Sequence, residues 1–181
     1  ELGPRPIDLH LAGLRDLGAE IREEGGFLHC RADRLRGREV VLRMPSVGAT
    51  ENLMLAACGA EGVTVISNAA REPEVVDLQN FLNACGARVS GAESSAVSIE
   101  GGQDLHGCTY RVMPDRIAAA TYLCAAASAG GDIYLRGAEE GHLSTVTAAL
   151  REAVDGLSRE SPRLAALRDR LIDGLTGLPY T

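Results

Sequence analysis

The first part of the chain alternates between the helical and the strand period of apolar residues. Leucines recur every third residue over 11–17, which predicts a helix that Asp8 can cap and Gly18 can end. Apolar and polar residues then alternate over 28–32, the pattern of a strand with one face in water. Further short apolar runs predict strands at 19–21, 40–42, 63–66, 97–99 and 109–112. Helices and strands that follow one another this closely indicate a layered α/β fold.

A repeat runs through this pattern. Residues 17–21 have a counterpart at 85–89, and residues 60–66 have one at 129–135, at spacings of 68 and 69 residues. One period therefore holds two helices and about four strands, with helices packed inside and sheets outside or beside them. The alanine-rich, nearly uncharged stretch 117–129 predicts a helix that is buried on every side.

Two polar loops each lead into a helix. Pro45-Ser46-Val47-Gly48 precedes an apolar helix expected from Thr50, and residues 67–74 follow a strand and lead into a helix that begins at Pro73. A helix start presents unpaired N–H groups and the positive end of the dipole, which suit a phosphate, and Glu51 reads as a first-turn carboxylate favoured by that dipole. Two ordinary capped helices would show the same residues. The local pattern leaves both interpretations open.

Composition limits the classes of partner. The chain has 181 residues, 45% of them hydrophobic, so it can bury a core of one or two domains. The net charge of −7 argues against a general nucleic-acid surface, and the lack of tryptophan argues against a base-stacking platform. All 18 cationic residues are arginines, so a few placed arginines would have to hold an anionic substrate.

Cysteine and histidine usage gives no sign of a metal or a disulfide scaffold. The five cysteines show no CxxC spacing and the four histidines are scattered, so we expect no metal site, no cofactor and a reduced, cytoplasmic protein. No signal peptide and no apolar run of membrane-spanning length stands out. The chain opens on Glu1 without an initiator methionine, and we expect a piece of a longer protein.

Four segments in order resemble one family. They are Arg5-Pro6-Ile7-Asp8-Leu9-His10, Ser46-Val47-Gly48-Ala49-Thr50-Glu51-Asn52, Asn68-Ala69-Ala70-Arg71-Glu72-Pro73-Glu74 and Pro114-Asp115-Arg116-Ile117. Together they resemble the UDP-N-acetylglucosamine enolpyruvyl transferases of the EPSP synthase family. The resemblance runs from Gly3 to about Ala153 and implies an inside-out α/β barrel, in which βαβαββ units pack around buried parallel helices; the barrel would be incomplete here.

The resemblance also implies a division of the chain. Residues 1–113 would be the back half of the domain that binds the UDP-sugar, and residues 114–153 would start the second domain. The match fails over 154–181, a divergent tail in which leucines at helical spacing predict an amphipathic helix over 157–175.

The implied reaction transfers the enolpyruvyl group of phosphoenolpyruvate to the 3-hydroxyl of UDP-N-acetylglucosamine, through a tetrahedral intermediate that eliminates phosphate. This is the first committed step of peptidoglycan synthesis, and so it bears on cell-wall biogenesis, cell shape and the cell cycle. The implied partners are these two substrates, with no nucleic acid and no membrane insertion; the sequence leaves the oligomeric state open.

The resemblance assigns roles to individual residues. The UDP-sugar pocket would be lined by Arg5, Pro6, Ile7, Asp8 and Leu9, and the diphosphate and uridine end would be held by Met44, Pro45, Ser46, Val47 and Gly48. Arg71, Glu72, Asp115 and Arg116 fall where the family keeps polar groups near the interdomain cleft. The last three are candidates for catalytic roles, but all four could equally form a structural ion-pair network.

Several departures limit the activity of the chain by itself. The reactive cysteine loop of the family would precede Glu1, the base aspartate would follow the chain, and Ala118-Ala119-Ala120 replaces the usual Glu-Thr-Gly. We therefore expect the isolated chain to be inactive. Two alternatives remain: a non-catalytic sugar-nucleotide-binding or scaffold relative, and the shikimate-pathway enolpyruvyl transferase, which shares the fold but lacks the Asn68–Glu74 signature.

Overall fold

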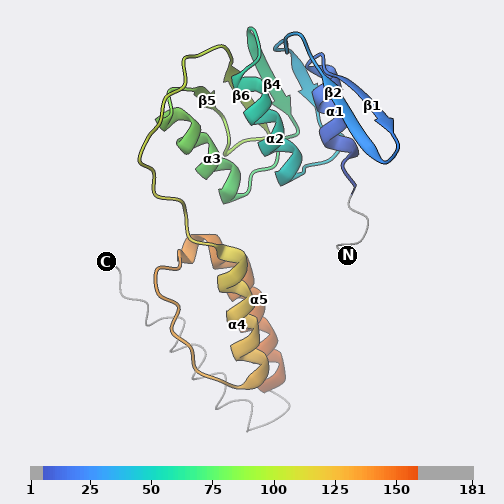
Figure 1. Cartoon of the computed structure of the whole chain (residues 1–181). Helices are drawn as coiled ribbons and strands as arrows, with labels where there is room; N and C mark the ends of the chain where they lie inside the picture. The colour runs from blue at the N-terminus through green and yellow to red at the C-terminus, as the bar shows by residue number, and fades with distance from the viewer. Residues whose placement is uncertain (1–5, 159–181) are drawn as a thin grey trace. The chain divides into compact units, whose positions relative to one another are not determined.

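Three helices lie side by side against a four-stranded sheet in the first part of the molecule (Figure 1). The structure is a computed structural model that describes residues 6–158. The chain divides into two compact units, residues 1–113 and 114–181. Arg5 and most of the tail 154–181, including most of the helix expected over 157–175, lie outside the described residues.

The first unit has two sheets. The elements of its described part are α1 (Asp8–Asp16), β1 (Glu20–Glu24), β2 (Phe27–Arg31), β3 (Glu39–Val41), α2 (Val47–Cys58), β4 (Val63–Ser67), α3 (Pro73–Ala84), β5 (Arg88–Ser90) and β6 (Ala96–Glu100). Strands β1 and β2 form an antiparallel hairpin, while the larger sheet has the order β3-β4-β6-β5. Only β3 and β4 pair in parallel in that sheet; the other neighbours are antiparallel. The layered α/β arrangement predicted from the sequence is therefore confirmed.

Helix α2 forms the centre of the core. It packs between α1 and α3 and against β4 and β6. Leu53 and Met54 of α2 are completely buried, together with Ile66 and Ile99 of the sheet. Helix α1 comes very close, because a Cβ added to Gly13 would lie 2.6 Å from the methyl groups of Leu53. The fit leaves no room for a larger residue at that crossing.

The repeat at 17–21 and 85–89 is confirmed as one shared turn from helix to strand. The N–H groups of residues 17, 18 and 19 donate to the carbonyl groups four, three and five residues earlier, at 3.1, 2.9 and 3.0 Å. Residues 85, 86 and 87 repeat this pattern at 3.0 Å in each case. Both turns pass through a glycine in the left-handed region, Gly18 with φ +102° and Gly86 with φ +95°. Only glycine adopts this conformation without a steric cost, which explains its recurrence.

Two predictions about strands in this unit need correction: the strand over 28–32 is present as β2 but lacks a buried face, and the strand over 109–112 is absent. Residues of β2 are exposed on both faces, with Phe27 at 72%, since β2 pairs only with β1 and it is β1, with its buried Ile21, that contacts α1. Residues 109–112 form no strand. Strand β6 already has β4 and β5 on its two edges, so the segment that follows it cannot pair with β6. It crosses to α3 instead, where the Tyr110 hydroxyl donates to Asp77 Oδ1 at 2.9 Å.

The second unit consists, in its described part, of two helices packed against each other, α4 (Arg116–Ala129) and α5 (Glu140–Ser158). The burial predicted for 117–129 is wrong: Ile117 and Tyr122 are 59% and 62% exposed, and Ala126 is the one buried residue of α4. Among the described elements α5 is the one that packs closely against α4, and much of the α4 surface is exposed. Residues 132–135, expected to repeat strand 63–66, form no strand and belong to the connection between the helices. No helix in the described part of the chain is long and apolar enough to cross a membrane.

Candidate functional site

The two polar loops meet at the end of the sheet where β3 and β4 finish. Strands β3 and β4 are parallel, with Val41 opposite Ser67, so the loops that follow them start side by side. The Leu42 N–H donates to the Ser67 carbonyl at 3.0 Å, and the Asn68 side-chain amide donates to the Leu42 carbonyl at 2.8 Å. Asn68 has φ +58°, a left-handed conformation that asparagine tolerates better than most residues. Loops at the carboxyl ends of parallel strands are where α/β proteins hold their ligands.

The first loop ends in a capped helix start. Helix α2 begins at Val47, three residues before the expected Thr50, and Ser46 is its N-cap: the Ser46 hydroxyl accepts from the Ala49 N–H at 3.4 Å. The first N–H groups of a helix have no carbonyl partner within the helix, so they point out towards the loop. Gly48 is exposed, and a Cβ added there would lie 3.5 Å from the ring of His10 in α1. The starts of α1 and α2 are therefore neighbours.

An ion pair joins the same two segments. The Asp8 carboxylate contacts the Arg43 guanidinium, next to Met44. Asp8 does not cap α1 as expected; it is the first helical residue, while Ile7 occupies the cap position without a side-chain hydrogen bond. Of the residues predicted to bind substrate, Pro6–Leu9 and Met44–Gly48 are thus brought together. Arg5, the remaining one, lies outside the described residues.

The second loop is fastened to the start of α2. The Ala70 N–H donates to the Thr50 hydroxyl at 3.1 Å, and both residues are buried. Glu72 is the N-cap of α3, its carboxylate accepts from the Arg71 N–H at 2.9 Å, and Pro73 is the first helical residue as predicted. No motif in the sequence singles out Thr50. A hydroxyl at a fully buried position of an apolar helix was the signal that it has a partner.

Glu51 lies beside this loop, and its predicted environment is wrong. It is the fifth residue of α2, beyond the first turn where the helix dipole acts. Partial burial, reinforced by the nearby Glu74 carboxylate, raises the pKa of Glu51 above its usual value. The dipole would have lowered that pKa, so desolvation and like charge outweigh it.

The four polar residues assigned to the cleft fall in different units. Arg71 and Glu72 belong to the first unit, while Asp115 and Arg116 belong to the second. Asp115 is the N-cap of α4, and its Oδ1 accepts from the N–H groups of Ile117 and Ala118 at 2.8 and 3.0 Å. A cleft that joins all four residues stays a prediction.

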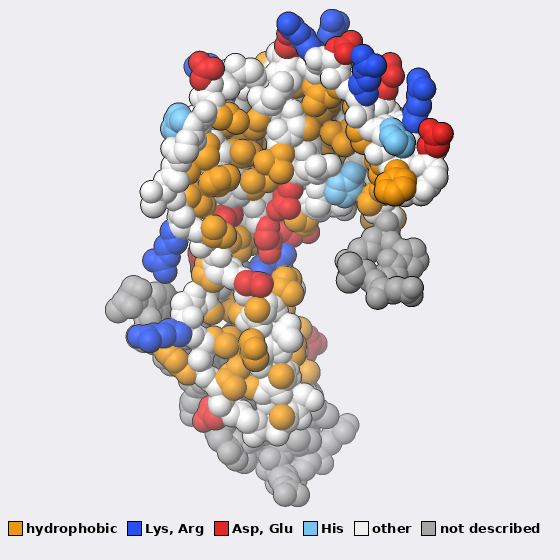
Figure 2. All heavy atoms as spheres, viewed as in Figure 1, with side chains coloured by type: hydrophobic (Ala, Val, Ile, Leu, Met, Phe, Trp, Pro, Cys, Tyr) orange, Lys and Arg blue, Asp and Glu red, His pale blue; other side chains and the backbone are white. Residues whose placement is uncertain are grey.

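Another candidate surface is less suited to an anion. Two open hollows of about 480 and 560 Å³ lie along the β1–β2 hairpin and residues 31–36, where Figure 2 shows side chains of both charges. Arg31 lies 3.6 Å from Asp33, and Arg34 pairs with Glu61, so acidic partners already offset these arginines. Among the described residues no group of three or more His, Cys, Asp or Glu side chains is placed to hold a metal ion.

The curated proteins that this chain resembles share one enzyme name. The chain is 48% identical over 183 residues to UDP-N-acetylglucosamine 1-carboxyvinyltransferase 2 of Caldanaerobacter subterraneus subsp. tengcongensis, which covers 99% of this chain and 44% of the relative. It is 56% identical over 182 residues to UDP-N-acetylglucosamine 1-carboxyvinyltransferase 1 of Symbiobacterium thermophilum, covering 99% and 41%. The chain thus spans less than half the length of these relatives.

Solved structures share the fold. The enolpyruvyl transferase NikO from Streptomyces tendae matches with a TM-score of 0.59 at 23% identity, over 67% of this chain and 31% of that one. EPSP synthase from Acinetobacter baumannii matches with a TM-score of 0.55 at 28% identity, over 71% and 29%. The predicted enolpyruvyl-transferase-like α/β fold is thereby confirmed. The family model described as EPSP synthase (3-phosphoshikimate 1-carboxyvinyltransferase) matches residues 1–162, and the chain therefore belongs to the EPSP synthase family.

Proposed function

We propose that this chain is part of a UDP-N-acetylglucosamine 1-carboxyvinyltransferase. That enzyme would transfer the enolpyruvyl group of phosphoenolpyruvate to the 3-hydroxyl of UDP-N-acetylglucosamine and release phosphate, a step of peptidoglycan synthesis in the cytoplasm. The names of relatives that are 48% and 56% identical over 99% of this chain support it, whereas the EPSP synthase structure is only 28% identical. Residues 1–113 would then be the back half of the UDP-sugar-binding domain, and residues 114–153 the start of the second domain.

The observation that carries the proposal is the meeting of the two helix starts, at Pro6–Leu9 and Met44–Gly48. The Asp8–Arg43 ion pair and the packing of Gly48 against His10 hold them together. The N-terminal N–H groups of α2 and the positive end of its dipole suit the diphosphate of a UDP-sugar. Exposed Ile7 and Met44 offer apolar surface beside those groups for the uracil ring.

Two hydrogen bonds would keep this site rigid. Asn68 ties the second loop to Leu42, and Thr50 ties it to α2 through Ala70. Loops fixed in this way pay less conformational entropy when a ligand binds. These two residues are positioning residues in the proposed site, since neither would have to touch the substrate.

The chemical step needs a proton donor for the new methyl group and a base for the sugar hydroxyl. By the family resemblance both would lie outside residues 1–181, so the chain alone would be inactive. Glu72 and Arg116 remain candidates for direct roles at the cleft. The Asp115 oxygen that caps α4 already accepts two N–H groups, which favours a structural role for that residue.

Calorimetric titration of the full-length protein with UDP-N-acetylglucosamine tests the proposed site. Arg5→Ala should weaken binding about 10- to 150-fold, because a hydrogen bond to a charged group contributes about 1.5–3 kcal/mol. Arg5→Lys should restore only part of this loss, since an ammonium group lacks the planar fork of guanidinium. Arg36→Gln, on an exposed segment beside the hairpin, is the matched control and should leave binding unchanged. Equal affinity of the wild-type protein and Arg5→Ala would remove Arg5 from the site.

A further inference from the structure

The segment that follows β6 lies along the outer face of α3 and is fastened to it at several points. The His106 N–H donates to the Cys85 carbonyl at 2.8 Å, and the Tyr110 ring meets the Phe81 ring edge to face, with 5.5 Å between centroids. The Tyr110 hydroxyl reaches Asp77 one turn further along the helix. We call residues 103–112 the strap.

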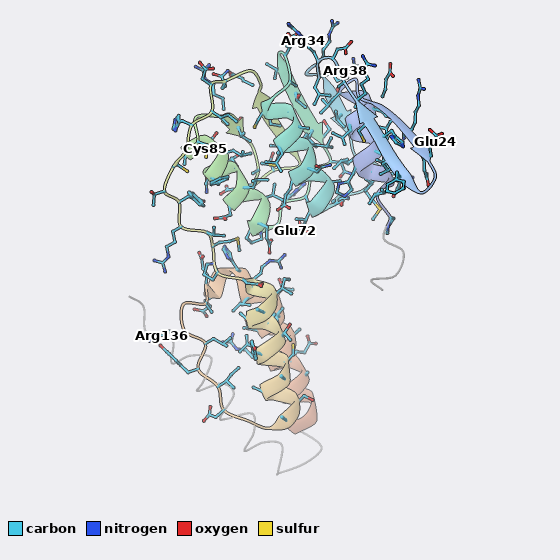
Figure 3. All side chains as sticks on the ribbon, in the orientation of Figure 1. Glu24, Arg34, Arg38, Glu72, Cys85 and Arg136 are labelled. Carbon is cyan, nitrogen blue, oxygen red and sulfur yellow. The ribbon has the colours of Figure 1, made fainter. Side chains whose placement is uncertain are left out.

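Two thiols meet where the strap begins to follow α3. The Sγ atoms of Cys85, at the end of α3, and Cys108, on the strap, are 3.4 Å apart. Cys108 is exposed, and Cys85, which is labelled in Figure 3, is half-buried, so small reagents have access to the pair. A disulfide needs about 2.05 Å between its sulfur atoms. Rotation of the exposed Cys108 side chain on its coil segment is the movement that would close this gap.

We propose that Cys85 and Cys108 form a dithiol that a hydroperoxide oxidises reversibly to a disulfide, which locks the strap onto α3. The Cys108 thiolate attacks one peroxide oxygen, so an S–O bond forms, the O–O bond breaks and hydroxide leaves. Cys85 sulfur then attacks the Cys108 sulfur, so the S–S bond forms and the second oxygen leaves as water with the Cys85 proton. Two thiols are oxidised and hydrogen peroxide is reduced to two waters.

The electrostatics of the pair agree with this division of roles. The hydrogen bond with Cys108, reinforced by desolvation, raises the pKa of the Cys85 thiol above its usual value. A raised pKa lowers the thiolate fraction of Cys85, and Cys108 is the more exposed of the two sulfurs, so Cys108 is the attacking group. Exposed disulfides of this kind are labile and are typical of redox sensing rather than of permanent cross-links. The strap leads to Met113, so oxidation would stiffen the chain just ahead of the second unit.

Mass spectrometry after mild oxidation tests the pair. The purified full-length protein is reduced, freed of reductant, treated with one equivalent of hydrogen peroxide and digested without reduction. We expect a Cys85–Cys108 cross-link that has lost two hydrogen atoms and that dithiothreitol reverses. Cys30 and Cys124 are exposed as well and serve as internal controls for simple accessibility. Cross-links that involve them as often as the pair would overturn the proposal.

The variant Cys85→Ser separates the pair from a single reactive thiol. Without its partner, Cys108 should accumulate as sulfenic acid, trapped by dimedone, whereas the wild-type protein should show little adduct there. Trypsin should cut after Arg111 several-fold more slowly in the oxidised wild type than in oxidised Cys108→Ser, because the disulfide holds the strap down. Equal adduct at Cys108 in wild type and Cys85→Ser would contradict the proposal, as would an unchanged rate of cleavage.

Discussion

Helices α2 and α4 are similar in composition but differ in how much of their surface other elements cover. Both are rich in alanine and almost free of charge, over 12 and 14 residues. Six residues of α2 are buried, because α1, α3 and the sheet surround it. In α4 one residue is buried, and α5 is its neighbour within the described part of the unit. An all-apolar helix therefore needs several covering layers, and its own pattern does not say whether they are present.

The difference predicts where the free energy of unfolding resides. The first unit has a closed core of its own, whereas the described part of the second unit presents large apolar side chains such as Ile117 to solvent. Matched substitutions in the two units should therefore differ strongly in their effects. The following changes compare the units, or covered and open positions within them.

The largest difference is expected for truncation of a large apolar side chain. Leu53→Ala in α2 should lower the free energy of unfolding by about 2–5 kcal/mol, because the side chain is completely buried and its cavity cannot collapse fully. Ile117→Ala in α4 should cost less than about 1 kcal/mol, since its side chain is mostly exposed. Urea unfolding curves of the two variants measure both. Equal losses would show that α4 is as well covered as α2.

The second largest difference in the free energy of unfolding is expected when a glycine in each unit is replaced by alanine. In Gly37→Ala the new Cβ would lie 2.5 Å from the backbone carbonyl of Val63, which cannot move aside without breaking the sheet, so about 1–3 kcal/mol should be lost. Gly141→Ala in α5 meets nothing within 4 Å and should stabilise that helix by up to about 1 kcal/mol. Thermal unfolding should shift in opposite directions for the two variants; a shift in the same direction would refute the contrast.

A buried and an exposed threonine provide a smaller contrast. Thr50→Val should cost about 1–3 kcal/mol, because the buried Ala70 N–H loses its acceptor. Thr121→Val in α4 removes an exposed bond to the Ile117 carbonyl and should change the free energy of unfolding by less than about 0.5 kcal/mol. Hydrogen exchange at the Ala70 amide should accelerate in Thr50→Val alone. Unchanged exchange there would mean that another group satisfies this amide.

The smallest effect concerns Glu51. Burial and the Glu74 carboxylate raise the pKa of Glu51 in the folded state, so the folded protein binds more protons than the unfolded chain. This contribution is present at low pH and is lost as the pH rises through the raised pKa. Glu51→Gln should therefore gain stability relative to wild type as the pH rises from about 4 to 7, by less than about 1 kcal/mol because the group is partly exposed. Unfolding curves at several pH values measure this trend; a difference between Glu51→Gln and wild type that stays constant with pH would contradict it.

Local signals in the sequence were enough to place most elements of the first unit. The Pro73 start of α3 and the two glycine turns at 18 and 86 follow from backbone preferences that a single residue carries. The strand expected at 109–112 does not form: β6, the strand before it, already pairs with β4 and β5, and Tyr110 of this segment bonds to α3 instead. Whether an edge is free depends on the whole sheet, so a short apolar run cannot report it.

The residues of the candidate site were predicted from the family resemblance more than from the hydrophobic pattern of the sequence. The family segments pointed to residues 6–9 and 44–48, and the structure brings the two together. The contacts that hold this region were not predictable, because Asp8–Arg43 and Asn68–Leu42 join residues far apart in the chain. Tertiary contacts of this kind do not produce a periodic pattern in the sequence. For a third contact, between Thr50 and Ala70, the sequence gives one indication: Thr50 is a polar residue within an apolar helix.

The central proposal is that this chain is part of an enzyme that transfers an enolpyruvyl group to a UDP-sugar rather than to shikimate 3-phosphate. The direct measurement incubates the full-length protein with phosphoenolpyruvate and either acceptor, and follows phosphate release together with the mass of the product. We predict one phosphate for each enolpyruvyl UDP-N-acetylglucosamine formed, no reaction with shikimate 3-phosphate, and no activity of the 181-residue chain alone. Turnover of shikimate 3-phosphate, or of neither acceptor by the full-length protein, would contradict the account.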